Sequence, residues 1–272
     1  MKIAVDSDLA YRLESAEGMS NADLVEAQAK LFPEVGACWE SVAGAFLMFD
    51  GVGSEISQSF GLGIQKLPTE DQWDQIESFF LDRGTAVNHE VCPLANPELL
   101  GSLHDRGYRP IEWSTVLFKT LEDQSVVGSG NIEVRLAEPE ESELWTETAV
   151  EGWSQYAEFK ELIAEFCGMN FSRKQSYCFF GLIDSIPIAT GSLIVQGNTA
   201  LLAGASTIPS ARQRGAQNAI LNTRLQFAQD LGCDIAMVVA APGSSSQKNA
   251  QRNGFDIAYS RTKWQKPAVQ DG

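Results

Sequence analysis

The chain has 272 residues, of which 44% are hydrophobic, 9% aromatic and 21% charged, the balance of an ordinary globular protein. Because this length exceeds the most common domain size, we expect two domains. The formal net charge of -16 gives a field that repels phosphate backbones and anionic lipid surfaces. We therefore do not expect the chain to bind nucleic acid or a membrane.

The five cysteines, an odd number, show neither the paired spacing of a zinc site nor a disulfide framework. The first residues contain no apolar run of signal-peptide length, and no window of the sequence is long enough to span a membrane. We therefore expect a cytoplasmic protein that holds no metal. The sequence does not predict an oligomeric state.

In the first half, residues 79–119 follow a clear order of helix end, strand, short helix and final strand. Gly84 follows the first helix, Pro93 follows the strand, and the pair Gly107-Tyr108 precedes the final strand. Residues 121–130 are polar and contain glycine, which is typical of a linker.

The second half alternates strands and helices. The expected strands are 131–138, 176–184, 187–196, 199–208, 234–240 and 255–264, and the expected helices are 139–152, 157–169, 216–231 and 244–253. Two residues separate the strands 176–184 and 187–196, and this spacing predicts a hairpin. The apolar run at 235–240 predicts a strand that is covered on both faces.

The second half ends with the same order of elements as residues 79–119. The matching positions are Asp82 with Asp230, Gly84 with Gly232, Pro93 with Pro242, Gly107 with Gly254 and Tyr108 with Phe255. Such a repeat predicts a duplicated fold. We place the two copies at residues 1–122 and 131–268, joined by a linker at 123–130.

The segment Ser206–Leu221 joins a strand to a helix through an arginine-rich turn. A helix start leaves backbone N–H groups unpaired and carries partial positive charge, so it favours an anion. Gly215 lets the backbone approach a ligand closely, and Arg212 and Arg214 add positive charge. The amides of residues 214–217 are therefore predicted to face a pyrophosphate.

Residues 212–217, Arg-Gln-Arg-Gly-Ala-Gln, resemble the acetyl-CoA signature Arg/Gln-x-x-Gly-x-Gly/Ala of the GNAT superfamily of N-acetyltransferases. Gln217 departs from that signature, because the family usually has glycine or alanine there. The likeness continues in order through the apolar strand, the helix with Asn249 and Arg252, and the pair Gly254-Phe255. It thus spans most of the second half.

The resemblance implies an α/β fold with a mixed sheet and two tandem GNAT-like acyl-CoA N-acyltransferase domains. Two central strands, 199–208 and 234–240, would separate to admit the pantetheine arm of acetyl-CoA, which would bind to backbone groups of the first strand. The implied cofactor-binding residues are Thr207, Ile208, Arg212, Gln213, Arg214, Gly215, Ala216, Gln217, Asn249 and Arg252.

Acyl transfer needs a neutral amine near the thioester, a donor for the developing oxyanion and often an acid for the departing thiolate. Many family members use a tyrosine as the acid, but the matching residue here is Ala250, and Tyr259 is a distant substitute. Residues 201–209 contain no carboxylate that could act as the base. The remaining candidates are Glu151 as the base and Trp153 and Tyr156 as acceptor-binding residues.

If the first half has the same fold, its cofactor turn falls within Leu62–Phe80. That segment lacks the signature, and Glu70 and Asp71 stand where a phosphate would have to bind. Carboxylates at this position oppose a dianionic pyrophosphate. We therefore predict that the first copy does not bind the cofactor.

The sequence thus predicts an acetyl-CoA-dependent N-acetyltransferase that acts on a primary amine of a small molecule or a peptide. The alternative is a non-catalytic acyl-CoA-binding sensor or structural protein, because the acid tyrosine and the strand carboxylate are both missing. A dinucleotide oxidoreductase is not favoured, since no Gly-x-Gly-x-x-Gly follows an early strand.

Overall fold

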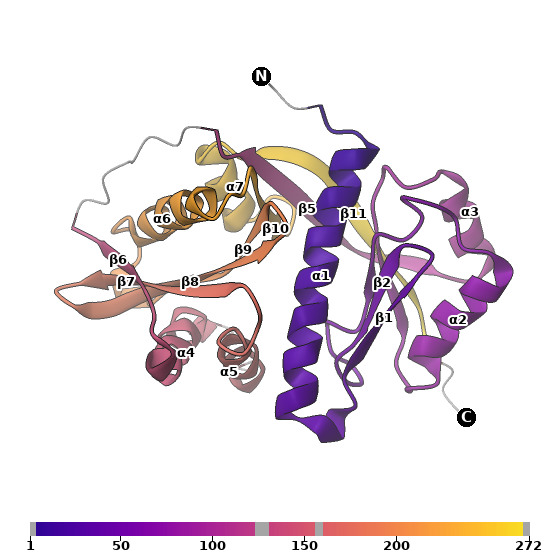
Figure 1. The fold of residues 1–272 in the computed structure, drawn as a ribbon, viewed down its shortest axis with the longest axis horizontal. Coiled ribbons are helices and arrows are strands. Elements are labelled where there is room, and N and C mark those ends of the chain that lie inside the picture. The colour runs from indigo at the N-terminus through magenta and orange to yellow at the C-terminus, as the bar shows by residue number, and fades with distance from the viewer. Residues whose placement is uncertain (1–3, 123–130, 156–159, 269–272) are drawn as a thin grey trace. The chain divides into compact units, whose positions relative to one another are not determined.

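The computed structural model of the chain describes residues 4–122, 131–155 and 160–268 (Figure 1). The chain divides into two compact units: Met1–Phe118 and Val239–Gly272 form unit 1, and Lys119–Val238 form unit 2. The chain passes from one unit to the other within the strands β5 (Arg109–Thr120) and β10 (Ile235–Ala240). In the part of the chain that the structure describes, no helix is long and apolar enough to cross a membrane.

Unit 1 contains a mixed sheet with the strand order β1-β2-β3-β4-β11-β5. Neighbouring strands are antiparallel except β3 and β4, which are parallel. The elements are α1 (Ser7–Leu31), η1 (Pro33–Val35), β1 (Cys38–Val42), β2 (Ala45–Phe49), β3 (Ser59–Phe60), α2 (Glu70–Leu81), β4 (Val87–Val91), α3 (Glu98–Asp105), β5, α7 (Ser245–Arg252) and β11 (Asp256–Lys266).

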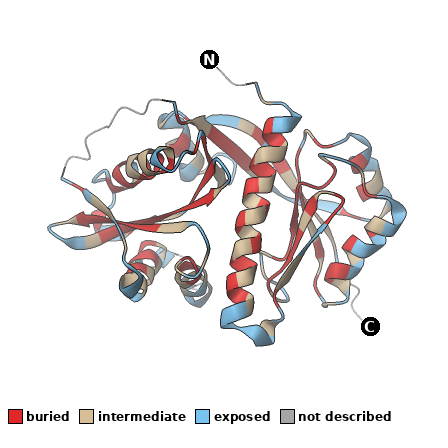
Figure 2. Cartoon of the chain, in the orientation of Figure 1, coloured by how far each residue is buried: buried red, intermediate tan, exposed pale blue. Residues whose placement is uncertain are grey.

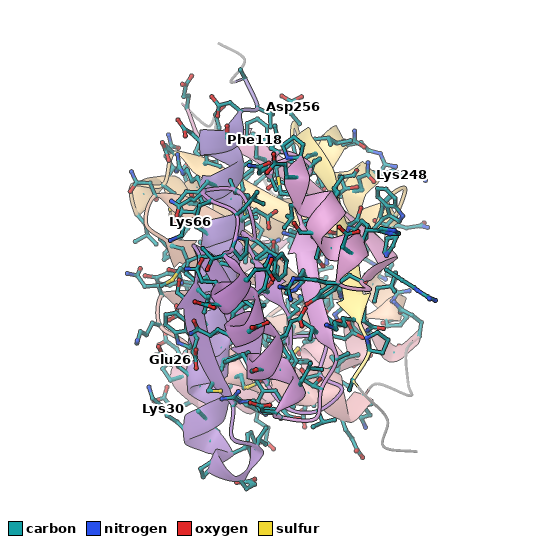
Figure 3. All side chains as sticks on the ribbon, turned by 90° about the vertical axis from the view of Figure 1, so that its right-hand side faces the viewer. Glu26, Lys30, Lys66, Phe118, Lys248 and Asp256 are labelled. Atoms are coloured by element: carbon teal, nitrogen blue, oxygen red, sulfur yellow. The ribbon has the colours of Figure 1, made fainter. Side chains whose placement is uncertain are left out.

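Two apolar layers hold unit 1 together. Helix α1 packs against β1, β2 and β3, and Asp6 caps its start by accepting a hydrogen bond from the Leu9 amide at 2.9 Å. A second cluster, which includes buried Trp73 and Tyr108, covers the sheet with α2 and α3. Figure 3 shows Phe118 and Asp256, register partners in β5 and β11, close together at one end of this strand pair.

Unit 2 has the strand order β10-β9-β8-β7-β6, in which only the β9/β10 pair is parallel. The remaining elements are β6 (Glu133–Leu136), η2 (Pro139–Glu141), α4 (Ser142–Gly152), α5 (Lys160–Met169), β7 (Ser176–Ile183), β8 (Ile186–Gln196), β9 (Thr199–Thr207), η4 (Pro209–Ala211) and α6 (Ala216–Asp230).

Helices cover both faces of the sheet in unit 2, with α6 on one face and α4 and α5 on the other (Figure 1). Most of β8 is consequently buried (Figure 2). Gly181 and Gly191 let α6 approach, because an added Cβ at either glycine would lie within 3.0 Å of the Ile220 side chain. On the opposite face, buried Trp145 donates a hydrogen bond from Nε1 to the Phe179 carbonyl at 3.0 Å.

The structure confirms the strands and helices expected in the second half, with ends that differ by a few residues. The residues 157–159 expected to begin a helix, and the linker 123–130, lie outside the described residues. The repeated order is also present: α2, β4, α3 and β5 in the first half correspond to α6, β10, α7 and β11 in the second.

The two compact units differ at the C-terminus from the predicted domains 1–122 and 131–268. Strand β11 lies between β4 and β5, so residues 239–272 pack with the first half of the chain. A division by packing does not test a boundary between two copies of a repeat, because copies can exchange strands. The predicted boundaries therefore stay a prediction.

Candidate functional site

Strand β9 has one open edge in unit 2. It pairs with β10 from Thr199 to Leu201 only, although β9 continues to Thr207. Beyond this stretch Ala203 is exposed, and the two residues that follow it are half-buried. Backbone groups on this edge are therefore available to a ligand, as the separation of the two strands expected from the sequence requires.

A β-bulge lies in the same part of β9. The register against β8 shifts between the pairs Thr190↔Ser206 and Ser192↔Ala203, so β9 carries one extra residue here. Gly204 within the bulge has a positive φ of 59°, which favours glycine. Bulges redirect backbone groups and are common beside functional sites.

The segment after β9 forms the predicted turn into α6. Residues 212–215 are exposed, and Gly215 is the N-cap of α6 with a positive φ of 88°. Gly215 supplies no side-chain cap, and the first turn of α6 contains no acidic residue. The helix start thus keeps its partial positive charge, which suits an anion such as a phosphate.

Two side chains of this turn bind protein groups. Arg212 donates from Nη2 to the Gly152 carbonyl at 2.9 Å and to Gln155 Oε1 at 2.6 Å. Gln217 donates from Nε2 to Thr207 Oγ1 at 2.6 Å. Arg212 therefore ties the turn to the end of α4, and Gln217 ties the start of α6 to the end of β9. Gln213 and Arg214 are exposed, and Ala216 is buried.

The backbone amides at the end of β9 differ in availability. The Ile208 amide donates to the Ile188 carbonyl at 3.0 Å, so it is already used in the pairing with β8. The alternation of antiparallel pairing then turns the Thr207 amide away from β8 and toward the open edge. Of these two amides, that of Thr207 is therefore the one that could donate to a ligand at the open edge.

Arg224 is a buried residue of α6 that the sequence reasoning did not select. Its Nη1 donates to the carbonyls of Ser192 and Ala203, at 2.8 and 3.1 Å, beside the bulge. The sequence did contain a sign of an unusual role for Arg224. This charged residue stands one turn after Ile220, on the face of α6 that packs against the sheet.

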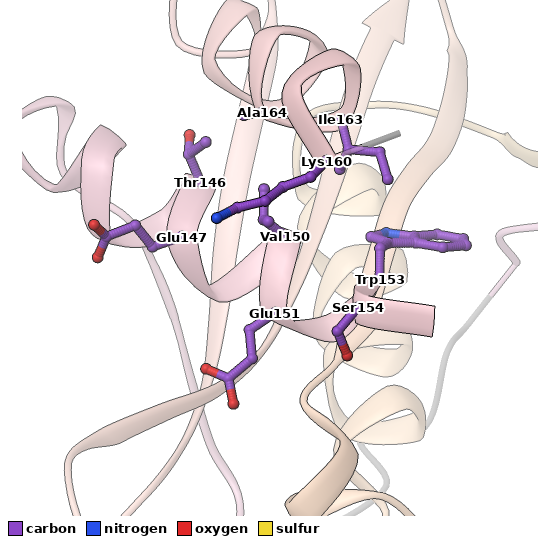
Figure 4. Close-up of a pocket in the computed structure, with 9 residues that line it drawn as sticks. All are labelled: Thr146, Glu147, Val150, Glu151, Trp153, Ser154, Lys160, Ile163 and Ala164. Carbon is purple, nitrogen blue, oxygen red and sulfur yellow. The ribbon is translucent and has the colours of Figure 1, made fainter. Parts of the chain in front are cut away.

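A pocket of about 460 Å³ lies between α4 and α5 (Figure 4). The candidate base Glu151 and the candidate acceptor-binding residue Trp153 both line it; the full lining is Thr146, Glu147, Val150, Glu151, Trp153, Ser154, Lys160, Ile163 and Ala164. In Figure 4 the Lys160 side chain runs from α5 toward α4, and the carboxyl groups of Glu147 and Glu151 point outward from successive turns of α4. Tyr156 lies outside the described residues.

The end of α4 connects this pocket to β9. Gly152 packs closely on the strand, since an added Cβ would lie 2.4 Å from Ser206 Oγ and 3.0 Å from the Thr207 nitrogen. Ser206 Oγ also donates to the Ala149 carbonyl at 3.2 Å. The open edge of β9 and the pocket therefore share the last turn of α4.

The other residues implied by the resemblance lie in unit 1. Asn249 is half-buried and Arg252 is exposed on α7, and their contact with a cofactor stays a prediction. Ala250 is buried. Tyr259 is also buried and donates from its hydroxyl to Glu14 Oε1 at 2.9 Å, and burial together with the Glu14 charge raises its pKa. Tyr259 is thus engaged within unit 1.

The corresponding helix start in the first half, at α2, is closed by its own residues. Thr69 and Gln72 form a reciprocal capping box, with hydrogen bonds of 3.4 and 3.1 Å. Glu70 and Asp71 occupy the first turn, and Glu70 forms an ion pair with Arg106. These contacts are consistent with the prediction that this copy does not bind the cofactor.

Among residues 4–122, 131–155 and 160–268, no three or more histidine, cysteine, aspartate or glutamate side chains are grouped to hold a metal ion. No protein-family model matches the chain, and no curated protein matches its sequence.

Solved structures share the fold of the chain. A GCN5-related N-acetyltransferase from Kribbella flavida superposes with a TM-score of 0.68 at 17% identity, covering 96% of each chain. A tandem GNAT protein from the clavulanic acid biosynthesis pathway gives a TM-score of 0.60 at 12% identity, covering 99% of this chain and 98% of its own. The chain therefore has the GNAT acyltransferase fold in its tandem form, which confirms the fold expected from the sequence.

Proposed function

We propose that the chain is an acyl-CoA-dependent N-acyltransferase that uses acetyl-CoA and acylates a primary amine of a small molecule or a peptide. The observation that carries this proposal is that the uncapped start of α6 directly follows the open, bulged end of β9. The helix start suits the pyrophosphate, and the open strand edge suits the amide groups of the pantetheine arm.

The proposed cofactor site consists mainly of backbone groups. The amides of residues 214–217 face the pyrophosphate, with the exposed Arg214 as the nearby cation. The open edge of β9, ending at Thr207 and Ile208, binds the pantetheine arm, and the Thr207 amide donates to the thioester oxygen. The side chains of Arg212 and Gln217 hold the turn in place, and Gln213 is exposed within it. Asn249 and Arg252 of α7 are further cofactor contacts that the resemblance implies.

The pocket between α4 and α5 is the proposed acceptor site. The amine nitrogen attacks the thioester carbonyl carbon, so that a C–N bond forms and the C–S bond breaks. The amine gives up one proton, and the departing CoA thiolate takes up one. Glu151 is the proposed base, acting directly or through water, and Trp153 offers an apolar wall for the acceptor.

One observation favours the alternative of a sensor that binds acyl-CoA without turnover. Ala250 cannot donate a proton, and the Tyr259 hydroxyl is committed to Glu14. A transferase with this site must therefore protonate the thiolate through water or through the substrate itself.

Two measurements separate these functions. Isothermal titration with acetyl-CoA reports binding, and release of free CoA in the presence of a panel of primary amines reports transfer. We expect both binding and amine-dependent release. Binding without amine-dependent release would favour the sensor, and absence of binding would overturn both functions.

The role of Glu151 has a matched control in the same pocket. We expect Glu151→Gln to lower kcat by about 100-fold, the lower end of typical general-base contributions. Glu147→Gln removes the same charge one turn earlier on α4. It should leave kcat within about threefold of the wild-type value, because an exposed charge that takes no part in proton transfer changes only the electrostatic potential in the pocket. Equal losses in both variants would remove Glu151 from the role of base.

A further inference from the structure

The buried guanidinium of Arg224 is held in unit 2 entirely by backbone carbonyls. The residue is only 3% exposed, and its Nη1 donates to Ser192 of β8 and Ala203 of β9. Gly191 makes room for it, because an added Cβ there would lie 3.1 Å from the Arg224 Cζ atom. The sheet is thus built around this side chain.

This burial is energetically costly. Within the described parts of the chain, no carboxylate pairs with Arg224, and its Nε is buried without a hydrogen-bond partner. Burial consequently lowers the pKa of the guanidinium to about 10, so it still carries its charge at neutral pH. A methionine or leucine would fill a similar volume without removing a charge from water.

The two carbonyls that Arg224 binds lie on neighbouring strands beside the bulge of β9. Ser192 and Ala203 are register partners on one side of the shift, and Thr190 and Ser206 are partners on the other. One nitrogen that binds a carbonyl from each strand fixes the spacing of the strands where regular pairing is interrupted. Arg224 therefore holds the bulge in its position.

The bulge lies within the open stretch of β9, upstream of Thr207. Ala203 is exposed, so the region that Arg224 supports from the side of α6 is accessible to a ligand along the edge of the strand. Under the proposed function, the thioester lies along this stretch. Negative charge develops on its carbonyl oxygen during acyl transfer, and a fixed positive charge in a dry environment stabilises that change.

We propose that Arg224 is a positioning residue for acyl transfer: it holds the β9 bulge so that the strand presents its amide to the thioester oxygen, and it supplies a fixed positive charge beside that strand. The inference rests on the proposed function. It assigns Arg224 an effect on the rate of transfer and little effect on the binding of acyl-CoA, since the proposed pyrophosphate site lies outside β9, at the start of α6 near Gly215.

The test compares Arg224→Met, Arg224→Lys and a control, Ile220→Val. Ile220 packs on the same face of α6 one turn earlier, and its truncation removes packing without changing charge. We expect Arg224→Met to lower kcat by about 10- to 100-fold, less than the loss of about 100- to 1,000-fold that follows removal of an oxyanion donor itself, because Arg224 acts through the strand. The KM for acyl-CoA should change by less than about threefold, and Arg224→Lys should recover part of kcat.

A second measurement tests the bulge itself. Hydrogen exchange of the amides at residues 203–207 should become faster in Arg224→Met than in Ile220→Val at equal thermal stability. The inference is overturned if kcat and exchange in Arg224→Met match those in Ile220→Val, or if the loss appears in KM for acyl-CoA with kcat retained. A wild-type chain without amine-dependent CoA release would overturn the proposed function, whereas an active wild type with an equally active Arg224→Met chain would overturn this inference alone.

Discussion

The two copies of the fold treat their equivalent helix starts in opposite ways. At α2 of the first copy, the Thr69 side chain caps the Gln72 amide, and Glu70 and Asp71 add negative charge. At α6 of the second copy, the cap is Gly215 and the first turn has no acid. The same element is therefore closed in one copy and open in the other, and an open helix start is the one that a phosphate can use.

The two buried arginines, Arg261 and Arg224, differ in the groups that bind them. Arg261 of β11 is surrounded by Glu14, Glu17 and Glu90, with N···O distances of 2.9, 2.8 and 3.0 Å. Burial disfavours its charge, but these carboxylates outweigh the penalty and raise its pKa. Arg224 has only carbonyl partners. Arg261 is thus paired with charged side chains, whereas the Nε of Arg224 is buried without a hydrogen-bond partner among the residues that the structure describes.

The largest effect that separates the two arginines is on stability. Arg261→Met removes the cation that three buried or nearly buried carboxylates share, of which Glu90 also pairs with Lys263, and we expect it to lower the free energy of unfolding by about 3–5 kcal/mol. Arg224→Met removes the hydrogen bonds to two carbonyls and leaves no unpaired charge. Its loss of unfolding free energy should therefore be clearly smaller. Urea unfolding of both variants measures this difference, and equal losses would break the comparison between the arginines.

The next effect concerns the open helix start. Gln217→Glu is nearly isosteric and places a carboxylate in the second position of α6, where α2 carries Asp71. We expect it to weaken acyl-CoA binding at least tenfold, about 1.4 kcal/mol, because the carboxylate repels the pyrophosphate. Titration calorimetry at low salt reports this change.

Gln229→Glu is the matched control for that substitution. It makes the same charge change in the last turn of α6 and should leave acyl-CoA affinity unchanged. If Gln217→Glu binds acyl-CoA as tightly as Gln229→Glu does, the pyrophosphate does not bind at this helix start.

The fold and the helix start could be predicted because both depend on local sequence. The order of helix, glycine, strand, proline and short helix is encoded in neighbouring residues, and Gly215 at the start of α6 is a local signal for a left-handed backbone. The sequence also shows directly that residues 201–209 contain no carboxylate that could act as a base. The open edge of β9 was implied by the resemblance to the GNAT superfamily. Glu151 and Trp153 were candidates because they stand where an expected helix ends, and both line one pocket.

The partners of individual side chains could not be predicted, because they depend on segments far apart in the chain. The bulge exists only in the register between β8 and β9, so the role of Arg224 has no local signature beyond a charge on a buried helix face. Arg212 binds Gly152, which lies 60 residues earlier. The insertion of β11 between β4 and β5 is likewise a matter of strand pairing, which the repeat alone does not specify.

A pH-dependent effect on stability is expected from Glu14, one of the buried charges of unit 1. Burial raises the pKa of Glu14 from 4.5 to about 7, although Arg261 opposes this. Between these values the folded chain holds a proton that the unfolded chain has released. The stabilisation from this proton is therefore present below pH 4.5 and lost as the pH rises through 7, at up to about 1.4 kcal/mol per pH unit.

Glu14→Gln should remove this dependence. We expect the variant to gain stability relative to the wild type as the pH rises from 5 to 7, because the neutral amide has no proton to lose. Urea unfolding of both chains across this range gives the difference. Parallel stability profiles would mean that Glu14 stays ionised within its contacts with Arg261 and Tyr259.

The smallest effect is expected at the start of α2, where the capping box and two acidic residues already disfavour a phosphate. Glu70→Gln combined with Asp71→Asn removes the acids from α2 and should change the free energy of unfolding by only about 0.3–1 kcal/mol for each charge at the helix end. Acyl-CoA should still bind once per chain, because Thr69 continues to cap the Gln72 amide at the helix start that a phosphate would need. A second bound acyl-CoA in this variant would show that charge alone had closed the first copy, and that the capping box had no part in it.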